Sequence, residues 1–395
     1  MTAHPLIRLK PKEGRRARAG APWIFSNEIV IDATARGLAP GTLVHAEADD
    51  GRSFGTGYFN PKTLIAVRLF GSSVDVAVDR GFLAERLARA LALRNRFYDR
   101  PYYRLVHAEG DGLPGAVIDR FGDTLVVQIA TAGMEMLLES LLAAADEVLS
   151  PAAVVLRADS PYRALEELPA YVRTAKGSDT ARLIVEENSA RYFADIHGGQ
   201  KTGWYYDQRD NRAFMARLSA EKSVFDAFCY TGGFAVAAAR ADAREVNGID
   251  SSTAALTLAE ESAAANGVAA RCRFVKADAM EELERLCERG EKFDVVIADP
   301  PPFVPARKDL EAGARAYRKL ARLAASVTRP GGFLLLASCS HNISAERFAQ
   351  ECATGIHRTG RRASLIRSAG AAPDHPVHPM LPETAYLKAL IYALD

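Results

Sequence analysis

A short apolar segment runs into a glycine turn at Asp226-Ala227-Phe228-Cys229-Tyr230-Thr231-Gly232-Gly233-Phe234. Glycines between a strand and a helix let the backbone approach a ligand closely. The spacing is not the GxGxxG of a dinucleotide-binding turn, whose glycines accommodate a pyrophosphate. The turn therefore indicates a ligand site at a strand-to-helix junction, and by itself it leaves the ligand undefined.

The residues around this turn alternate between short apolar segments and helical stretches. Strands are expected at 223–228, 245–250, 272–276, 293–298 and 332–338. Such alternation predicts a mostly parallel, doubly wound α/β sheet with a Rossmann-like topology. Ligands of these sheets bind at the carboxyl ends of the strands, so we expect the active site there.

Acidic residues end four successive predicted strands: Asp226, Asp250, Asp278 and Asp299. A single acid at such a position is usually a turn residue or a helix N-cap. Four in order suit a ligand that carries a cationic sulfonium and amine, a ribose and an adenine, and they suit a pyrophosphate poorly. Asp250 is placed to accept from the ribose hydroxyls, and Asp278 from the adenine amino group.

The composition indicates a globular cytosolic protein. The chain has 395 residues, 48% hydrophobic and 25% charged, with a net charge of +1. Its apolar runs are too short to span a bilayer, and residues 1–20 lack the apolar core of a secretory signal. The five cysteines include no CxxC pair, which favours reduced thiols over disulfides or zinc. His375 and His378 stand in a proline-rich loop away from any cysteine, so no metal is expected.

Three domains are predicted: a small β-rich domain at 1–72, an α+β domain at 73–185, and the Rossmann-like domain at 186–395. The first twenty residues carry six basic side chains against one acid, Glu13: Arg8, Lys10, Lys12, Arg15, Arg16 and Arg18. A clustered basic arm is a typical electrostatic footprint for phosphate. A solvated, frayed terminus explains it equally well.

The fourth predicted strand ends in Asp299-Pro300-Pro301-Pro302-Phe303. Prolines stiffen this backbone, so that Asp299 can engage an amino group or ring nitrogen of a planar base. Pro300 and Phe303 are expected to line the base site, and the ring of Phe303 can stack on the base. The motif resembles one found in methyltransferases that modify exocyclic amines and in those that modify cytosine C5. It therefore predicts a planar nitrogenous substrate and leaves the methylated atom open.

Cys339 follows the fifth predicted strand in Ser338-Cys339-Ser340-His341. Cytosine C5 is a poor nucleophile, and addition of a thiolate to C6 activates it. Such covalent catalysis needs a partly exposed cysteine with thiolate character, whereas amine methylation needs none. The strand-end position favours a nucleophile over a buried structural cysteine. His341 is a candidate for the base that removes the C5 proton, although a surface or capping role suits it better.

The segment from Gly199 to Arg212 (GQKTGWYYDQRDNR) resembles the signature that precedes the first strand in bacterial 23S rRNA cytosine-C5 methyltransferases. The Rossmann-like half resembles class I S-adenosylmethionine-dependent methyltransferases in general. The resemblance implies S-adenosylmethionine as cofactor, Cys339 as nucleophile, and contact of Asp299 with cytosine N3 or N4. The position where many relatives carry a second cysteine is proline here. The candidate cofactor-binding residues are Thr202, Tyr206, Gln208, Asp226, Tyr230, Gly232, Asp250, Ser251, Asp278, Ala279 and Asp299.

The N-terminal residues resemble a PUA domain, a small RNA-binding β-barrel. The likeness rests on residues 15–20, on Pro22-Trp23-Ile24-Phe25 and on residues 55–60. It implies that Arg15 and Arg16 contact RNA. The partner expected from the family is 23S rRNA or a precursor of the large ribosomal subunit, and a homodimer is a family-level expectation.

The sequence thus predicts an RNA cytosine-C5 methyltransferase that takes up a flipped-out cytidine. An RNA methyltransferase that modifies an exocyclic amine of guanine or adenine, without using Cys339, is the alternative. A non-catalytic RNA-binding protein with the same fold is a third reading. The intact acids Asp250, Asp278 and Asp299 argue against it.

Overall fold

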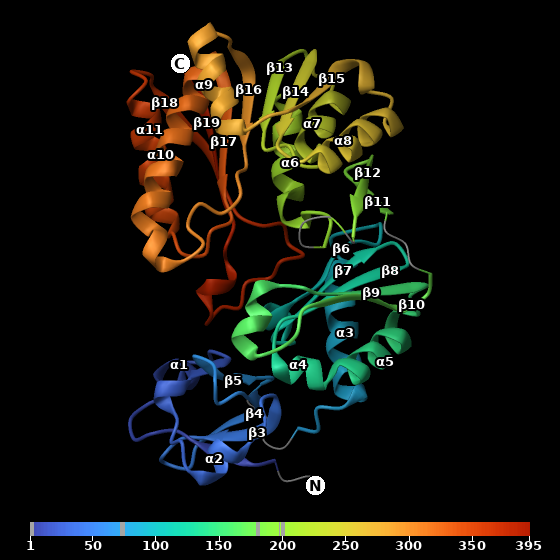
Figure 1. Cartoon of the computed structure of the whole chain (residues 1–395), viewed down its shortest axis with the longest axis vertical. Helices are drawn as coiled ribbons and strands as arrows, with labels where there is room; N and C mark the ends of the chain where they lie inside the picture. The colour runs from blue at the N-terminus through green and yellow to red at the C-terminus, as the bar shows by residue number, and fades with distance from the viewer. Residues whose placement is uncertain (1–3, 72–75, 179–181, 197, 199–201) are drawn as a thin grey trace. The chain divides into compact units, whose positions relative to one another are not determined.

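The computed structural model describes residues 4–71, 76–178, 182–196, 198 and 202–395 (Figure 1). The chain forms two compact units. The first comprises Met1–Ala181, Ile196–Gly203 and Pro373–Thr384, and the second comprises Arg182–Asp195, Trp204–Ala372 and Ala385–Asp395. Among the described residues, no helix is both long and apolar enough to cross a membrane.

The first unit begins with a five-stranded sheet in the order β1-β3-β4-β5-β2. The strands are β1 (Leu6–Arg8), β2 (Trp23–Phe25), β3 (Thr42–Glu47), β4 (Ser53–Phe59) and β5 (Ile65–Leu69), with short helices α1 (Arg15–Arg18) and α2 (Ala33–Gly37). Ile24, Val44 and Phe59 are fully buried in its core. The basic arm is therefore folded in part, because Arg15 to Arg18 form α1.

A second five-stranded sheet, in the order β10-β9-β8-β7-β6, completes the first unit. Its strands are β6 (Tyr102–His107), β7 (Ala116–Phe121), β8 (Thr124–Ile129), β9 (Ala153–Ala158) and β10 (Tyr171–Lys176), and its helices are α3 (Arg80–Arg94), α4 (Ala132–Met136) and α5 (Leu138–Leu149). Tyr58 of the first sheet is buried among these elements, and its hydroxyl lies 2.9 Å from Oγ1 of Thr131. Because the two sheets form one compact unit, the boundary predicted at residue 72 stays a prediction.

The second unit holds a seven-stranded sheet in the order β15-β14-β13-β16-β17-β19-β18 (Figure 1). The strands are β13 (Ser223–Ala227), β14 (Glu245–Asp250), β15 (Cys272–Lys276), β16 (Phe293–Ala298), β17 (Thr328–Ser338), β18 (Ala363–Ala369) and β19 (Lys388–Leu394). The first five are parallel, and β19 runs antiparallel between β17 and β18. The predicted doubly wound α/β fold is confirmed.

Helices cover both faces of this sheet (Figure 1). One side carries α6 (Arg209–Arg217), α7 (Gly233–Arg240) and α8 (Thr253–Ala265), and the other carries α9 (Ala279–Arg289), α10 (Leu310–Val327) and α11 (Ala345–His357). A hairpin of β11 (Arg182–Glu187) and β12 (Ala190–Asp195) packs on α8. With both faces covered, the central strands are continuously apolar rather than alternating.

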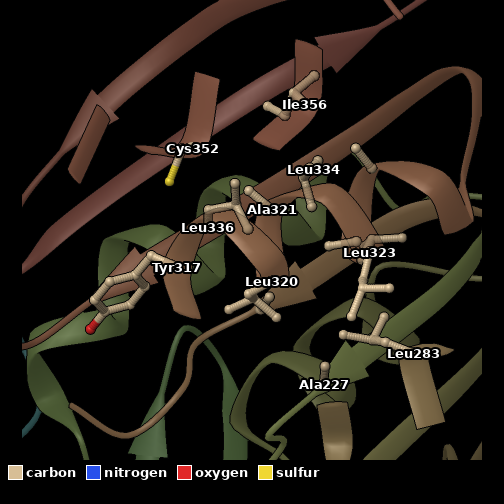
Figure 2. Packing of buried hydrophobic residues seen from close by; sticks show 14 of the residues in the cluster. Ala227, Leu283, Tyr317, Leu320, Ala321, Leu323, Leu334, Leu336, Cys352 and Ile356 are labelled. Carbon is tan, nitrogen blue, oxygen red and sulfur yellow. The ribbon is translucent and has the colours of Figure 1, made fainter. Parts of the chain in front are cut away.

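The packing of α10 on β17 supports one wall of the candidate site. Tyr317, Leu320, Ala321 and Ala324 recur at helical spacing and form a buried stripe on α10. Figure 2 shows Tyr317, Leu320 and Ala321 of this stripe with Leu334 and Leu336 of β17 and with Cys352 and Ile356 of α11. Tyr317 lies at the end of the stripe, and this packing fixes where its hydroxyl reaches.

Candidate active site

The loop between β13 and α7 has an unusual backbone. Phe228, Tyr230 and Gly232 have φ angles of 65°, 50° and 78°. Positive φ is uncommon for residues other than glycine, and such strain concentrates at functional sites. A Cβ on Gly232 would lie 2.9 Å from the Cβ of Ala259. Glycine is therefore required at 232 both by the backbone and by the packing of α8.

Asp226 holds this loop from inside. Its side chain is 1% exposed, and Oδ2 accepts a 3.0 Å hydrogen bond from the backbone N–H of Ala235 in the first turn of α7. Burial raises the pKa of Asp226 well above its usual range, and the nearby Asp299 and Asp250 add to the rise. The hydrogen bond to Ala235 thus gives Asp226 a structural role. Direct contact of Asp226 with a cofactor stays a prediction.

Asp250 joins the first two strand ends. Its Oδ2 accepts from the backbone N–H of Tyr230 at 2.9 Å, and its Oδ1 accepts from the backbone N–H of Ser252 at 2.8 Å. A carboxylate offers about four acceptor positions, so two donors leave capacity for a ribose diol. Ser251, beside it, is exposed. The geometry fits the predicted role of Asp250.

Asp278 is the N-cap of α9. Its Oδ1 accepts from the backbone N–H groups of Met280 and Glu281 at 2.9 and 3.0 Å. This is the ordinary structural use of an acid at a strand end. The side chain is nevertheless exposed beside the strand ends, and Ala279 is buried in the core. Contact of Asp278 with adenine remains a prediction.

The segment at 204–212 lies against the ends of β13 and β16. The side-chain amide of Gln208 donates to Oδ2 of Asp299 at 2.9 Å. The rings of Tyr205 and Tyr230 meet edge to face, with centroids 5.3 Å apart. Tyr206 and Gln208 are 1% and 2% exposed. The structure thus brings Tyr206, Gln208, Tyr230 and Asp299 to one end of the sheet, as the sequence predicts.

A buried ion pair fixes the same segment. Both side-chain donors Nε and Nη2 of Arg212 bond Glu187 of β11, at 2.6 and 2.8 Å. Nη2 also donates to the carbonyl of Tyr205 at 2.8 Å. Bidentate arginine–carboxylate pairs are geometrically specific, so the backbone at Tyr205 is held firmly.

The start of the signature behaves differently. Gly199, Gln200 and Lys201 lie outside the described residues. Thr202 belongs to the first unit, where it is fully buried and its hydroxyl donates to Asp119 at 2.5 Å. Its cofactor contact stays a prediction.

Two polar atoms at this site suit a polar ligand. The hydroxyl Oγ1 of Thr231 and the amide oxygen Oδ1 of Asn211 are buried and have no hydrogen-bond partner among the described residues. Buried polar groups are nearly always bonded, so each unpaired atom calls for a partner. With the acid Asp250 and the glycine at 232, this donor set fits S-adenosylmethionine. The residues that would hold it are Gln208, Tyr230, Thr231, Asp250 and Asp299.

The loop after β16 carries the predicted base site. Asp299 is half-buried, Pro300 is buried, and Phe303 is half-buried. The ring of Phe303 packs on Tyr317 with centroids 4.9 Å apart, and its backbone N–H donates to the Tyr317 hydroxyl at 3.3 Å. The structure thus gives Phe303 a fixed position on α10.

Cys339 follows β17 directly and is half-buried. The buried hydroxyls of Ser338 and Ser340 flank it, and each lies 2.8 Å from the Tyr317 hydroxyl. Oγ of Ser340 also accepts from the backbone N–H of Val304 at 3.2 Å. Tyr317 therefore ties the cysteine loop to the loop that carries Asp299.

Hydrogen bonds link the loops that carry Cys339 and Asp299. Oγ of Ser340, next to Cys339, accepts from the backbone N–H of Val304 in the loop that follows Asp299. Burial raises the pKa of Tyr205 above its usual range, and nearby Tyr230, Asp207, Asp299 and Cys339 add to the rise. A shared catalytic role of Cys339 and Asp299 stays a prediction.

The other cysteines are poor nucleophiles. Cys229 and Cys352 are buried, and burial raises the pKa of both thiols. Burial also raises the pKa of Cys272, to about 11, and that of Cys287. A raised pKa keeps a thiol protonated and unreactive. Cys339 differs in its place at the carboxyl end of a central strand.

His341 is exposed, whereas His375 is buried. The ring of His341 packs on Tyr386 with centroids 5.2 Å apart, and the Tyr386 hydroxyl donates to Asp207 at 2.5 Å. His375 bonds Asp374 through Nδ1 at 2.8 Å. Among the described residues, no cluster of His, Cys, Asp and Glu could hold a metal ion.

The two predicted RNA-binding arginines differ. Arg15 is exposed, whereas Arg16 makes a bidentate pair with Glu383 at 2.8 and 3.0 Å. Arg18, next in the arm, pairs with Asp49 and Asp50. The arm is thus partly neutralised within the molecule.

Three residues at the site had no signal that identified them in the sequence. Tyr205 stands inside the signature but resembles its neighbours there, and Tyr317 looks like one more apolar residue of α10. Lys388 begins β19, and its Nζ donates to the carbonyl oxygens of Ser340 and Ile343 at 2.6 and 3.0 Å. Its role becomes visible only when β19 is seen to pair with β17.

Comparisons with known families agree with this fold. A family model described as a PUA-like domain matches residues 7–71, and one described as an S-adenosylmethionine-dependent methyltransferase matches residues 172–393. The chain therefore belongs to the family of S-adenosylmethionine-dependent methyltransferases and carries an N-terminal PUA-like domain.

Close relatives extend over almost the whole chain. The "Ribosomal RNA large subunit methyltransferase I" of Shewanella amazonensis is 37% identical over 98% of both chains. The protein of the same name from Tolumonas auensis is 36% identical over 94% of both.

Two solved structures share the fold at low identity. One, a proposed SAM-dependent methyltransferase from Streptococcus mutans, has a TM-score of 0.83 at 19% identity and covers 98% of this chain and 100% of its own. Another, a proposed methyltransferase complexed with SAH, has a TM-score of 0.84 at 18% identity and covers 99% and 100%.

Proposed function

We propose that the protein methylates C5 of a cytidine in 23S rRNA, with S-adenosylmethionine as methyl donor and Cys339 as covalent catalyst. The class of substrate rests on the relatives, which are named as methyltransferases of large-subunit ribosomal RNA. The site of action of such an enzyme is cytoplasmic, and the PUA-like domain at 7–71 would help to bind the RNA.

The observation that carries the mechanism is the position of Cys339. Its half-buried thiol follows β17, and the neighbouring Ser340 hydroxyl accepts from the backbone N–H of Val304, in the loop that begins at Asp299. Methylation of an exocyclic amine has no use for a thiol there, whereas C5 methylation requires one.

Cys339 and Asp299 have separate roles in the proposed reaction. The Cys339 thiolate adds to C6 of the base, which makes C5 nucleophilic. Asp299 bonds N3 or N4 and holds the base so that C6 faces the thiolate. S-adenosylmethionine, when bound, supplies the electrophilic methyl group. Loss of the C5 proton to a base then expels the thiolate and restores the aromatic ring.

The target base has to leave its stack to meet these groups. Phe303, seated on Tyr317, is placed to stack on such a base. Since the aromatic face accepts any base, selectivity for cytosine falls to Asp299.

The test is the identity of the methylated nucleoside. Purified protein is reacted with unmodified 23S rRNA and methyl-labelled S-adenosylmethionine, and the RNA is digested to nucleosides. We expect labelled 5-methylcytidine from the wild type and from Cys287→Ala, and none from Cys339→Ala. A labelled N-methylguanosine or N-methyladenosine would overturn the proposal in favour of amine methylation by the Asp-Pro-Pro-Pro-Phe loop.

A further inference from the structure

The cysteine loop is held on its far side by Lys388. This residue begins β19, and in the antiparallel ladder it pairs with Ser338, the residue before Cys339. Its Nζ donates to the carbonyl oxygens of Ser340 and Ile343, at 2.6 and 3.0 Å. The lysine therefore contacts the loop both before and after the thiol.

The charge at this position is costly to keep. Lys388 is half-buried, and burial lowers the pKa of its amine. A neutral side-chain amide at position 388 also carries two N–H groups and could bond the two carbonyl oxygens. The positive charge of the lysine is therefore not needed for these two bonds alone.

The same contacts bring the ammonium close to the Cys339 backbone, because Ser338 pairs with Lys388 and Ser340 accepts from its Nζ. Consistent with this, Cys339 is among the groups that influence the pKa of Lys388, and also those of Tyr317 and Tyr205. Burial raises the pKa values of both tyrosines, so they are neutral near pH 7. Lys388 is thus the cation among these three residues.

We propose that Lys388 is the positioning residue of Cys339: it fixes the Ser338-to-Ile343 loop through two carbonyls, and its ammonium favours the thiolate that attacks C6. The inference rests on the proposed function for its catalytic meaning. An ammonium has three donors, and the two carbonyl bonds engage two of them. A cation beside a thiol favours the ionised form.

Alkylation of Cys339 tests the charge directly. The rate of carbamidomethylation of Cys339 by iodoacetamide is followed by peptide mass spectrometry from pH 6 to 10, in the full-length protein. The midpoint of this profile should rise by about one pH unit in Lys388→Met, because loss of an opposite charge nearby disfavours the thiolate. Lys388→Arg, which keeps the charge, should restore the wild-type midpoint.

Two controls separate charge from structure. Tyr317→Phe loosens the same loop without changing charge, so its midpoint should stay at the wild-type value. Lys319→Met removes a lysine from α10 that pairs with Glu284 at the surface, and it should leave the midpoint unchanged. If Lys388→Met does not fold, the shift is read from Lys388→Gln, which retains a donor.

The outcomes are distinct from those of the proposed function. A wild-type midpoint in Lys388→Met, or an equal rise in Tyr317→Phe, would overturn the role of Lys388. Methylation by Cys339→Ala would instead overturn the covalent mechanism, while the alkylation profile would still report on the lysine. In the methylation assay, the pH at which kcat rises should also increase in Lys388→Met and return in Lys388→Arg.

Discussion

The side-chain amide of Gln208 donates a 2.9 Å hydrogen bond to Oδ2 of Asp299. The bond joins the signature segment before the sheet to the loop after β16. The side-chain oxygen Oε1 of Gln208 in turn accepts a hydrogen bond from Nδ2 of Asn211 at 2.7 Å. The orientation of the Asp299 carboxylate is therefore set by a residue far away in the sequence.

Gln208→Leu should disorient Asp299. A hydrogen bond to a charged group contributes about 1.5–3 kcal/mol, so we expect the single-turnover rate of methylation to fall by roughly tenfold to a hundredfold. The exposed Gln350 on α11 offers a matched control, since Gln350→Leu should retain the wild-type rate. Equal rates in the two variants would show that the Gln208–Asp299 bond has no catalytic effect.

Asp226 should make the protein less stable as the pH rises. Its native pKa is raised above the ordinary 3.8, chiefly by burial. A raised native pKa means that the folded state binds the proton more tightly than the unfolded state, so the contribution to stability is complete below pH 3.8 and declines as pH increases toward the native pKa.

The Asp226→Asn variant checks this, because its side chain cannot ionise. Urea unfolding of the second unit, followed at a series of pH values, should show a shallower loss of stability with rising pH in Asp226→Asn than in the wild type. Parallel curves would mean that Asp226 titrates as it does in the unfolded chain.

Tyr317→Phe should impair both activity and stability. The hydroxyl joins Ser338, Ser340 and the backbone of Phe303, and at about 1 kcal/mol for each typical hydrogen bond its loss costs roughly 3 kcal/mol. We expect a lower Tm and, at temperatures where the variant is folded, a fall in kcat of about tenfold for the loss of loop alignment. Tyr162→Phe, at an exposed position, is the control. A drop in Tm without a drop in kcat would contradict the alignment role.

The basic arm should contribute less to RNA binding than its charge suggests. Arg16 and Arg18 already pair with Glu383, Asp49 and Asp50. Neutralising Arg15 alone should therefore lower the salt slope of RNA binding by nearly as much as neutralising all three, by about one phosphate contact. Filter-binding titrations over a range of KCl concentrations measure the slopes. A much larger loss in the triple variant would show that the internal pairs open on RNA.

The parallel core of the second unit was predictable because its signals are local. Continuous apolar strands, a glycine turn and acids at strand ends are each read within a few residues, and β13 to β17 formed where they were expected. The last two strands were not predicted, and β18 is largely exposed and held by its pairing with β19. Prediction of such a strand depends on contacts distant in the sequence.

The same distinction applies to the site. Asp250, Asp299 and Cys339 follow strands directly, so the topology alone brings them to one end of the sheet. Tyr317 and Lys388 reach that end from a helix and from the last strand. Their importance comes from the hydroxyl and ammonium positions, which depend on side-chain packing that a single sequence does not reveal.

The covalent role of Cys339 is the central claim, and RNA that carries 5-fluorocytidine tests it most directly. Fluorine at C5 cannot leave as a proton does, so the methylated adduct cannot expel the thiolate. With S-adenosylmethionine present, the wild type should form a protein–RNA complex that survives denaturing electrophoresis, and a tryptic peptide containing Cys339 should carry the nucleotide. Cys339→Ala should form none while still binding S-adenosylmethionine. A stable complex in Cys339→Ala, or no complex in a wild type that methylates cytidine, would contradict the mechanism.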